Sequence, residues 1–268
     1  WFMMYFLSVV LVGTVYPIFL DVISSQKISV GPPFYHKLIA PFLIPFLLMM
    51  AIGPKLKWIR SDLKDQIYLI ALLIVSVLIS FFIVKNFNSN ILVNTILISG
   101  ALYLFFITLR DFLNNKYKNF AQNTAHFGFS LLILSILFNN LFSSEIITNL
   151  KVGETYDNSK TKIVFESINQ KKEKNYKSII ANFNITNSEG VNNNLSPELR
   201  IYNQPNITTS EADIKTTLMK DKFIVINLVQ NQDYFNVRYQ VKPFMLWIWL
   251  SVIMISLGGL VSFLQKRI

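Results

Sequence analysis

Two histidines are the residues of this chain best suited to a chemical centre, and the chain contains no cysteine. Without cysteine, this chain alone forms no disulfide, no thiolate zinc site and no iron–sulfur cluster. His126 lies in the segment Asn123-Thr-Ala-His-Phe-Gly-Phe-Ser130, at the start of a long apolar run. An ionisable group in such a run is a functional candidate, and a neutral imidazole is well suited to bind a metal. We therefore predict that His126 is a candidate metal ligand.

Two interpretations of His126 fit the residues equally well. The histidine is either a ligand inside the membrane or a half-exposed residue at the membrane boundary, beside a contact between small residues. Gly128 fits both, because a residue without a side chain lets a flat ring or another helix come close. His36 is predicted to lie in a solvated loop in which Gly31-Pro32-Pro33 forms a rigid turn. No Ser-His-Asp or Cys-His set can be assembled, so no catalytic residue is predicted.

The composition is that of a membrane protein. Hydrophobic residues make up 52% of the chain and charged residues only 15%, well below the roughly 25% charged residues of soluble domains. Apolar runs of about 20 residues are long enough to cross a bilayer as helices. We predict six spans: 1–20, Leu38–Ile52 with Pro41 and Pro45 inside it, Ile67–Val84, Ile91–Leu109, Ala125–Phe142 and Phe244–Leu264.

A polar segment of about a hundred residues separates the fifth span from the sixth. Alternating apolar and polar residues in this segment, as in Tyr234–Lys242, predict β-strands. The predicted fold is an α-helical integral membrane protein with a mostly β extracytoplasmic domain inserted before the last helix. Its predicted parts are residues 1–142 with five spans, residues 143–242 with the β-rich domain, and residues 243–268 with the last helix and a cytoplasmic tail.

The predicted β domain is a small antiparallel sandwich or barrel. Its other predicted strands are 222–230, Lys162–Ile168, Glu198–Tyr202 and one that contains the alternating residues Ile179, Ala181, Phe183 and Ile185. Residues 231–233 should form the turn of a hairpin before Tyr234. Ser210 and Asp213 have the spacing of a capping box, which predicts a short helix over Glu211–Met219.

Basic residues in the short loops predict the orientation of the chain. Nine lie on one side of the predicted spans and three on the other. The two sets are Lys55, Lys57, Arg60, Lys64, Arg110, Lys116, Lys118, Lys266 and Arg267, and Lys27, Lys37 and Lys85. This bias predicts that the C-terminus lies on the inner, cytoplasmic side of the membrane and the β domain on the outer side. Because the basic residues follow the spans, we expect membrane lipid as a partner and no nucleic acid.

The polar residues within the predicted spans have structural interpretations. Ser76, Ser80, Asn94 and Thr95 are expected to form hydrogen bonds between helices. No acidic residue falls within any predicted span, so a relay of buried carboxylates is not supported. The tryptophans Trp58, Trp247 and Trp249 are predicted to be anchors at the membrane boundary.

Four stretches of the chain resemble the C-terminal portion of the CcmF family, the membrane subunits of the haem lyase that matures c-type cytochromes. The resemblance covers essentially the whole chain in order and spacing. The stretches are the first span with Lys27-Ile-Ser-Val-Gly-Pro-Pro-Phe-Tyr35, Ala125-His-Phe-Gly128, Pro197-Glu-Leu-Arg-Ile-Tyr202 with Thr208-Thr-Ser-Glu-Ala-Asp213, and Val241-Lys-Pro-Phe-Met-Leu-Trp-Ile-Trp249 with Gly258-Gly259.

The resemblance implies a function and a cofactor. It implies haem delivery from the haem chaperone CcmE to apocytochrome c at the periplasmic face, with CcmH- and CcmI-like subunits as further partners. It places His126 as an axial ligand of the iron of a transmembrane haem b, with Gly128 allowing close approach. The family more often has Asn at the position of His36, so no ligand role is carried over to it. The chain begins at Trp1 inside an apolar run, and we expect it to be the C-terminal part of a longer protein, with an upstream half that carries the haem-presenting segment.

Two other classes of function remain open from the residues themselves. A transporter or permease half would have broken or polar helices around a site at the middle of the membrane, and only Asn94 and the span with Pro41 and Pro45 suggest this. A non-catalytic assembly scaffold would keep its function when His126 is replaced. The resemblance favours an enzyme complex, a cytochrome c haem lyase, to which this chain contributes without the haem-presenting segment.

Overall fold

The chain folds into two compact units in a computed structural model. One is helical and contains residues 1–137 and 250–268, and the other contains residues 138–249. The second unit includes the last turn of the fifth helix and the first turn of the sixth. The structure describes residues 1–24, 28–55, 63–87, 90–114, 120–187, 190–229 and 233–265.

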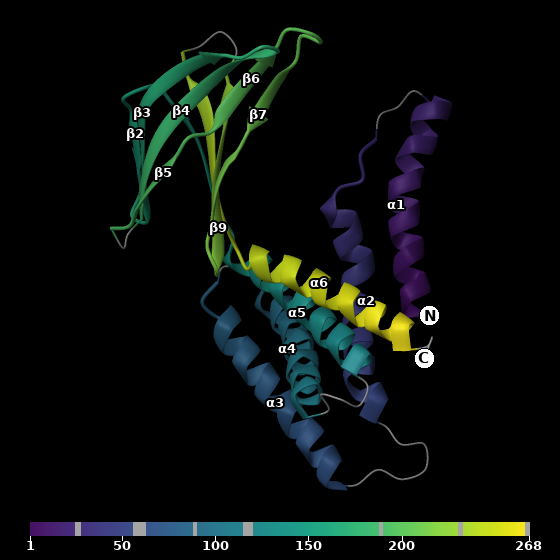
Figure 1. Cartoon of the computed structure of the whole chain (residues 1–268). Coiled ribbons are helices and arrows are strands. Elements are labelled where there is room, and N and C mark those ends of the chain that lie inside the picture. Colours follow the sequence, from purple (N-terminus) through teal and green to yellow (C-terminus); the bar gives the residue numbers. More distant parts are fainter. Residues whose placement is uncertain are drawn as a thin grey trace. The chain divides into compact units, whose positions relative to one another are not determined.

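Six helices in the described part of the chain are long and apolar enough to cross a membrane (Figure 1). They are α1 (Phe2–Ser24), α2 (Pro32–Ile52), α3 (Leu63–Val84), α4 (Ile91–Asn114), α5 (Phe120–Phe142) and α6 (Met245–Gln265). A short 3₁₀ turn, η1 (Gly53–Lys55), follows α2. The six predicted spans are thus confirmed as helices. Helices are suited to cross a membrane because they satisfy their own backbone hydrogen bonds in hydrocarbon.

The second helix begins earlier than its sequence pattern suggested. Gly31 is the residue that precedes α2, and Pro32 and Pro33 take its first positions. Proline is favourable there because the first N–H groups of a helix have no partner within the helix. Gly31-Pro32-Pro33 therefore starts a helix instead of forming a loop turn. His36 is an exposed residue of α2, so its predicted place in a loop was wrong.

Helix α4 packs against both α2 and α3, and hydroxyl groups link the helices at several points. Ser80 Oγ of α3 donates to the Thr95 carbonyl of α4 at 2.7 Å. Thr108 of α4 and Ser130 of α5 share a buried hydrogen bond of 2.8 Å. The predicted interhelical role is thus confirmed for Ser80. It was wrong for Ser76, whose hydroxyl donates to the Leu72 carbonyl of its own helix, and for Thr95, whose buried hydroxyl has no hydrogen-bond partner among the described residues.

Two glycines allow α5 and α6 to approach closely. A Cβ atom added to Gly128 would lie 3.0 Å from the backbone nitrogen of Ile255 and the carbonyl oxygen of Ser251. A Cβ atom added to Gly258 would lie 2.8 Å from the carbonyl oxygen of Ala121 and from both N and Cβ of Ala125. Small residues let helices pack backbone to backbone in a membrane, where apolar burial supplies little driving force.

Replacing Gly258 with leucine should separate α5 from α6. We expect Gly258→Leu to destabilise the helical unit by about 1–3 kcal/mol through overpacking. Helix content of the full chain should be followed during titration with SDS. Gly259→Leu is the matched control, because no atom lies within 4 Å of a Cβ added at Gly259. Equal stability of the two variants would contradict the close contact at Gly258.

The second unit is a β-sandwich of two antiparallel sheets. The first sheet has the order β1-β10-β9-β8, and the second has the order β2-β3-β4-β6-β7 with β5 also paired to β4. The strands are β1 (Ser144–Leu150), β2 (Thr155–Asp157), β3 (Thr161–Lys172), β4 (Tyr176–Asn187), β5 (Asn192–Leu195), β6 (Glu198–Tyr202), β7 (Thr208–Glu211), β8 (Asp213–Thr216), β9 (Lys220–Leu228) and β10 (Phe235–Pro243).

Side chains from both sheets form one core. Val237 and Tyr239 of β10 are buried, as their alternation with polar residues predicted. They join fully buried residues from the other strands of the two sheets, namely Ile163, Phe165, Ala181, Phe183, Ile185, Ile224 and Ile226. The rings of Phe165 and Phe183 stack with centroids 4.4 Å apart. The prediction of a mostly β domain before the last helix is confirmed.

The predicted short helix over Glu211–Met219 was wrong. The segment contains the end of β7 and all of β8, followed by a turn into β9. The polar side chains that suggested a helix cap bond elsewhere: Asp213 accepts the Ser196 N–H at 2.6 Å, and Ser210 Oγ donates to Asn227 Oδ1 at 2.5 Å. Pairing with β6 and β9 supplies more backbone hydrogen bonds than an isolated two-turn helix would.

The ends of α5 and α6 meet within the β unit. β1 starts directly after α5, and β10 ends directly before α6, with Ser144 paired to Val241. Asn139 Nδ2 donates to the Pro243 carbonyl at 2.5 Å. The ring of Phe244 lies 5.5 Å from that of Phe138 and 6.4 Å from that of Phe142. Phe244 has φ +61°, a conformation that bulky residues adopt only when their surroundings enforce it.

Candidate functional site

His126 lies in the second turn of α5 and is half-buried. The helix begins at Phe120, five residues before the predicted start of the fifth span, so His126 lies deeper in the helix than its sequence pattern suggested. The neighbouring ring of Phe127 stacks on Phe112 of α4, with centroids 5.3 Å apart and an interplanar angle of 18°. It also contacts Phe105 at 5.5 Å. These aromatic contacts fix the rotation of α5 and hence the direction of His126.

His126 lines a small cavity between the end of α2 with η1, the last turns of α4 and the first turns of α5. The cavity has a volume of about 160 Å³. It is lined by Met50, Ala51, Pro54, Lys55, Ile107, Thr108, Asp111, Gln122, Asn123 and His126. Most of its polar groups therefore come from helix ends, and a histidine, an aspartate and a lysine are brought together from three separate parts of the sequence.

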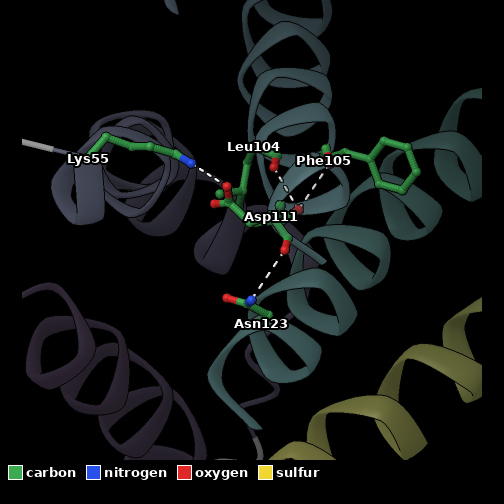
Figure 2. Close-up of polar contacts among 6 residues, drawn as sticks. Lys55, Leu104, Phe105, Asp111 and Asn123 are labelled. Carbon is green, nitrogen blue, oxygen red and sulfur yellow. Dashed lines mark hydrogen bonds and ion pairs between the residues drawn. The ribbon is translucent and has the colours of Figure 1, made fainter. Parts of the chain in front are cut away.

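An ion pair forms one wall of this cavity. Lys55 and Asp111 are joined by a salt bridge, with side chains 27% and 25% exposed. Figure 2 shows Lys55 reaching towards Asp111, and Asn123 pointing its side-chain nitrogen at the backbone oxygen of Asp111, 3.3 Å away. Thr108, one turn earlier in α4, donates to the carbonyl oxygens of Leu104 and Phe105. The wall is thus held by contacts among η1, α4 and α5.

Asp111 and Lys55 are residues that sequence reasoning missed as parts of a site. Lys55 served only as a charge for orientation, and Asp111 was placed beyond the predicted end of the fourth span. The candidate span 91–113 contains Asp111, and the span Phe2–Ser24 contains Asp21, so the statement that no acidic residue falls within a span was wrong. The amphipathic end of α4, Arg110-Asp111 after an apolar run, was the signal available in the sequence.

The surroundings of Gly128 identify its neighbour in this chain. Gly128 faces the backbone of α6 at Ser251 and Ile255, so another helix fills the space that its missing side chain leaves. The contact of Gly128 with a haem ring stays a prediction.

His126 is the group in this cavity best suited to bind a metal, because a neutral imidazole can donate a ring nitrogen. Among the described residues, no group of three or more His, Cys, Asp or Glu side chains could hold a metal ion. An imidazole alone is a common axial ligand of haem. The cavity of about 160 Å³ is smaller than the roughly 300–1,000 Å³ of pockets that enclose drug-sized ligands. The cavity accommodates small polar groups beside His126, and a ring as large as haem would need further walls.

The β unit carries two surface clusters of charged residues. Arg200 pairs with Glu198 at 3.1 Å and Glu211 at 3.9 Å and lies over the ring of Tyr176. The Arg200 hydrogen bond lowers the pKa of Glu198. On β1, hydrogen bonds from Gln240 and then Arg238 lower the pKa of Glu145.

Both carboxylates have a lowered pKa in the folded state. Their contribution to stability is therefore present above the ordinary pKa of glutamate and is lost as the pH falls through the lowered values. We assign these clusters a structural role, since each charge is paired within the unit.

Several predicted features fall on residues outside the described part of the chain. These are the anchor Trp58, the turn residues Asn231 and Gln232, and the loop charges Lys27, Lys57, Arg60, Lys116, Lys118, Lys266 and Arg267. The orientation that those charges suggest stays a prediction. The other two predicted anchors are described: Trp247 donates its indole N–H to the Leu218 carbonyl at 3.1 Å, and Trp249 is 65% exposed.

The fold defines a class: a multi-pass membrane protein with a β-sandwich inserted before its last helix. A family model described as the CcmF C-terminal beta-sandwich matches residues 141–243. A solved structure titled "Cytochrome c Heme Lyase CcmF" shares the fold with a TM-score of 0.70 at 19% identity, covering 97% of this chain and 43% of that one.

Curated relatives extend the likeness to the sequence of both units. The cytochrome c-type biogenesis protein CcmF of Pseudomonas fluorescens is 26% identical over 97% of this chain and 42% of its own length. The CcmF of Escherichia coli is 25% identical over 97% of this chain and 41% of its own length. The chain thus spans about two-fifths of these relatives. Together the findings support a C-terminal CcmF portion, as the sequence motifs predicted.

The ion pair beside His126 should couple α2 to α4. We expect the stability losses of Asp111→Asn and Lys55→Met to be non-additive by about 1 kcal/mol, because each single variant leaves a half-buried polar group without its partner. SDS titration of the full chain, the two variants and the double variant measures this coupling. The exposed pair Lys171–Glu173, 69% and 37% exposed, is the control and should show coupling near zero. Strict additivity at Lys55 and Asp111 would show that the pair does not link the helices.

Proposed function

We propose that this chain takes part in cytochrome c maturation, as a membrane portion of a haem lyase that delivers haem to apocytochrome c. The observation that carries the proposal is the likeness of 97% of the chain to proteins named cytochrome c-type biogenesis protein CcmF. Haem is the cargo in this proposal, passed from a chaperone of the CcmE type to the apocytochrome. The proposed location is the bacterial inner membrane, with the β-sandwich in the periplasm and the C-terminus in the cytoplasm.

In this proposal His126 is an axial ligand of a haem b within the membrane. Haem b supplies one-electron chemistry when bound. The imidazole must be neutral, with one ring nitrogen towards the iron and the other fixed by a hydrogen bond that sets the tautomer. Asp111 and Asn123 line the same cavity as His126 and offer the oxygens for that hydrogen bond. Lys55 would balance the charge of Asp111, so the ion pair would act as a positioning element for the ligand.

The second axial ligand is proposed to come from outside this chain. The chain's other histidine, His36, lies in the first turns of α2, whereas Lys55 beside the His126 cavity follows the far end of the same helix. The 16 residue steps from His36 to Ile52 rise by about 24 Å along a helix. His36 therefore cannot face His126 across one iron. The upstream half of a CcmF protein is the proposed source of the second histidine.

The proposed task of the β-sandwich is to dock partner proteins near the site of haem attachment. Candidate partners are CcmE, CcmH- and CcmI-like subunits and the apocytochrome. The sandwich contains no histidine and no cysteine, and its one methionine is Met219. We therefore assign haem ligation to the helical unit and docking to the sandwich.

The His126 proposal predicts a spectroscopic loss. When this chain is combined with the upstream half, we expect a low-spin haem b spectrum that His126→Ala abolishes together with cytochrome c maturation. Absorption spectra of the purified complex measure the haem, and covalent haem staining of a reporter cytochrome measures maturation.

His36→Ala is the control and should leave both readouts unchanged. If His126→Ala also keeps the low-spin spectrum, His126 is a residue of the membrane boundary. If it keeps maturation as well, the assembly scaffold becomes the better account of the chain.

The proposed orientation predicts the behaviour of reporter fusions. A reporter active only in the periplasm should give signal when fused after Phe142 and none when fused after Asn115, because the nine-to-three bias of basic residues places these positions on opposite sides. A cytoplasm-active reporter at the same two positions should give the inverse pattern. Signals of the reversed kind would place the β-sandwich in the cytoplasm and remove it from periplasmic haem attachment.

A further inference from the structure

The turn between β8 and β9 presents two large apolar side chains to the exterior. Leu218 is 62% exposed and Met219 is 54% exposed. The turn is tightly closed: the Thr217 N–H and hydroxyl donate to the Lys220 carbonyl at 3.1 and 2.6 Å. The β unit therefore displays an apolar tip that its own packing leaves uncovered.

This tip is hydrogen-bonded to the beginning of α6. The Phe244 N–H donates to the Met219 carbonyl at 2.8 Å, and the Trp247 indole N–H donates to the Leu218 carbonyl at 3.1 Å. All of these residues belong to the β unit itself. The two residues of the tip are thus fixed at the level at which α6 begins. Met245 and Trp247, the residues that mark this level, are only about 3 Å apart along the helix axis.

That level is a membrane boundary, because α6 is long and apolar enough to span a bilayer. The end of α5 reaches the same place, where Asn139 bonds to Pro243. Trp247 and the exposed Trp249 are residues typical of the headgroup layer, since an indole combines an apolar ring with a polar N–H. Lys215 and Lys220 flank the tip, as basic residues flank apolar groups in segments that lie in the membrane interface.

We propose that the tip formed by Leu218 and Met219 inserts into the lipid interface beside the start of α6. The occupant of this surface is the boundary between headgroups and acyl chains in the leaflet from which the β-sandwich emerges. Burial of the two side chains in lipid, with Trp247 bonded behind them, fixes the β8–β9 edge of the sandwich to the membrane surface. The proposal depends on α6 crossing the membrane and does not depend on haem binding or on cytochrome c maturation.

A single cysteine can report the depth of each position, because the chain contains none. Leu218→Cys and Met219→Cys, made separately in the full chain, are labelled with an environment-sensitive nitrobenzoxadiazole dye. The proteins are placed in vesicles of phosphatidylcholine and phosphatidylglycerol, with or without bromine on the acyl chains. Val191→Cys, on the hairpin between β4 and β5, is the matched control, because Val191 is apolar and 49% exposed. Leu257→Cys, 50% exposed in α6, is the reference for a bilayer position.

We expect both tip labels to emit at shorter wavelength than the Val191 label. Brominated lipid should quench them several-fold more strongly than the Val191 label and towards the value of the Leu257 label. Two positions are tested so that one poorly folded variant does not decide the result. Tip labels that behave like the Val191 label, with the Leu257 label quenched, would overturn the proposal and show that the tip faces water.

Discussion

The pairing of β1 with β10 is the constraint on which the rest of this structure depends. β1 directly follows α5 and β10 directly precedes α6, and the two strands are neighbours from Ser144↔Val241 onwards. The ends of both helices are therefore held together where they meet the β-sandwich. The hydrogen bond from Asn139 to Pro243 and the contacts of the Phe244 ring lock this junction. The unfavourable positive φ of Phe244, a cost of roughly 1–3 kcal/mol, persists because these contacts outweigh it.

Within the helical unit, α5 and α6 pack closely against each other. Gly258 brings α6 against Ala121 and Ala125 of α5. Ala125 is the residue that precedes His126. The same turns of α5 carry Phe127, held between aromatic rings of α4, and Asn123, bonded to Asp111. The position of His126 is thus set from two sides, by a backbone contact with α6 and by polar and aromatic contacts with α4. This fixed geometry would suit the proposed role of His126 as a haem ligand, because a side chain that rotates freely loses conformational entropy when it binds.

The division into a helical unit and a β-sandwich separates two kinds of chemistry. The helical unit holds His126 beside the Lys55–Asp111 ion pair, in a small cavity lined by polar groups. The sandwich holds paired surface charges, such as Arg200 with Glu198 and Glu211, and an apolar tip beside α6. The first arrangement suits ligation inside the membrane. The second suits contact with proteins and lipid at its surface.

The sequence alone determined the six spans, the β domain before the last span and His126 as the candidate ligand. These features follow from apolar length, strict alternation and the scarcity of histidine, which are local or compositional signals. Tertiary structure decided the rest. Strand pairing with β6 and β9 overrode the helix-like spacing of Ser210 and Asp213. The position of His36 in α2 has a local cause instead, because Gly31 precedes the helix and two prolines take its first positions. The partnership of Lys55, Asp111 and His126 joins residues far apart in sequence. No local pattern could show it, because only the packing of α2, α4 and α5 brings those helix ends to one cavity.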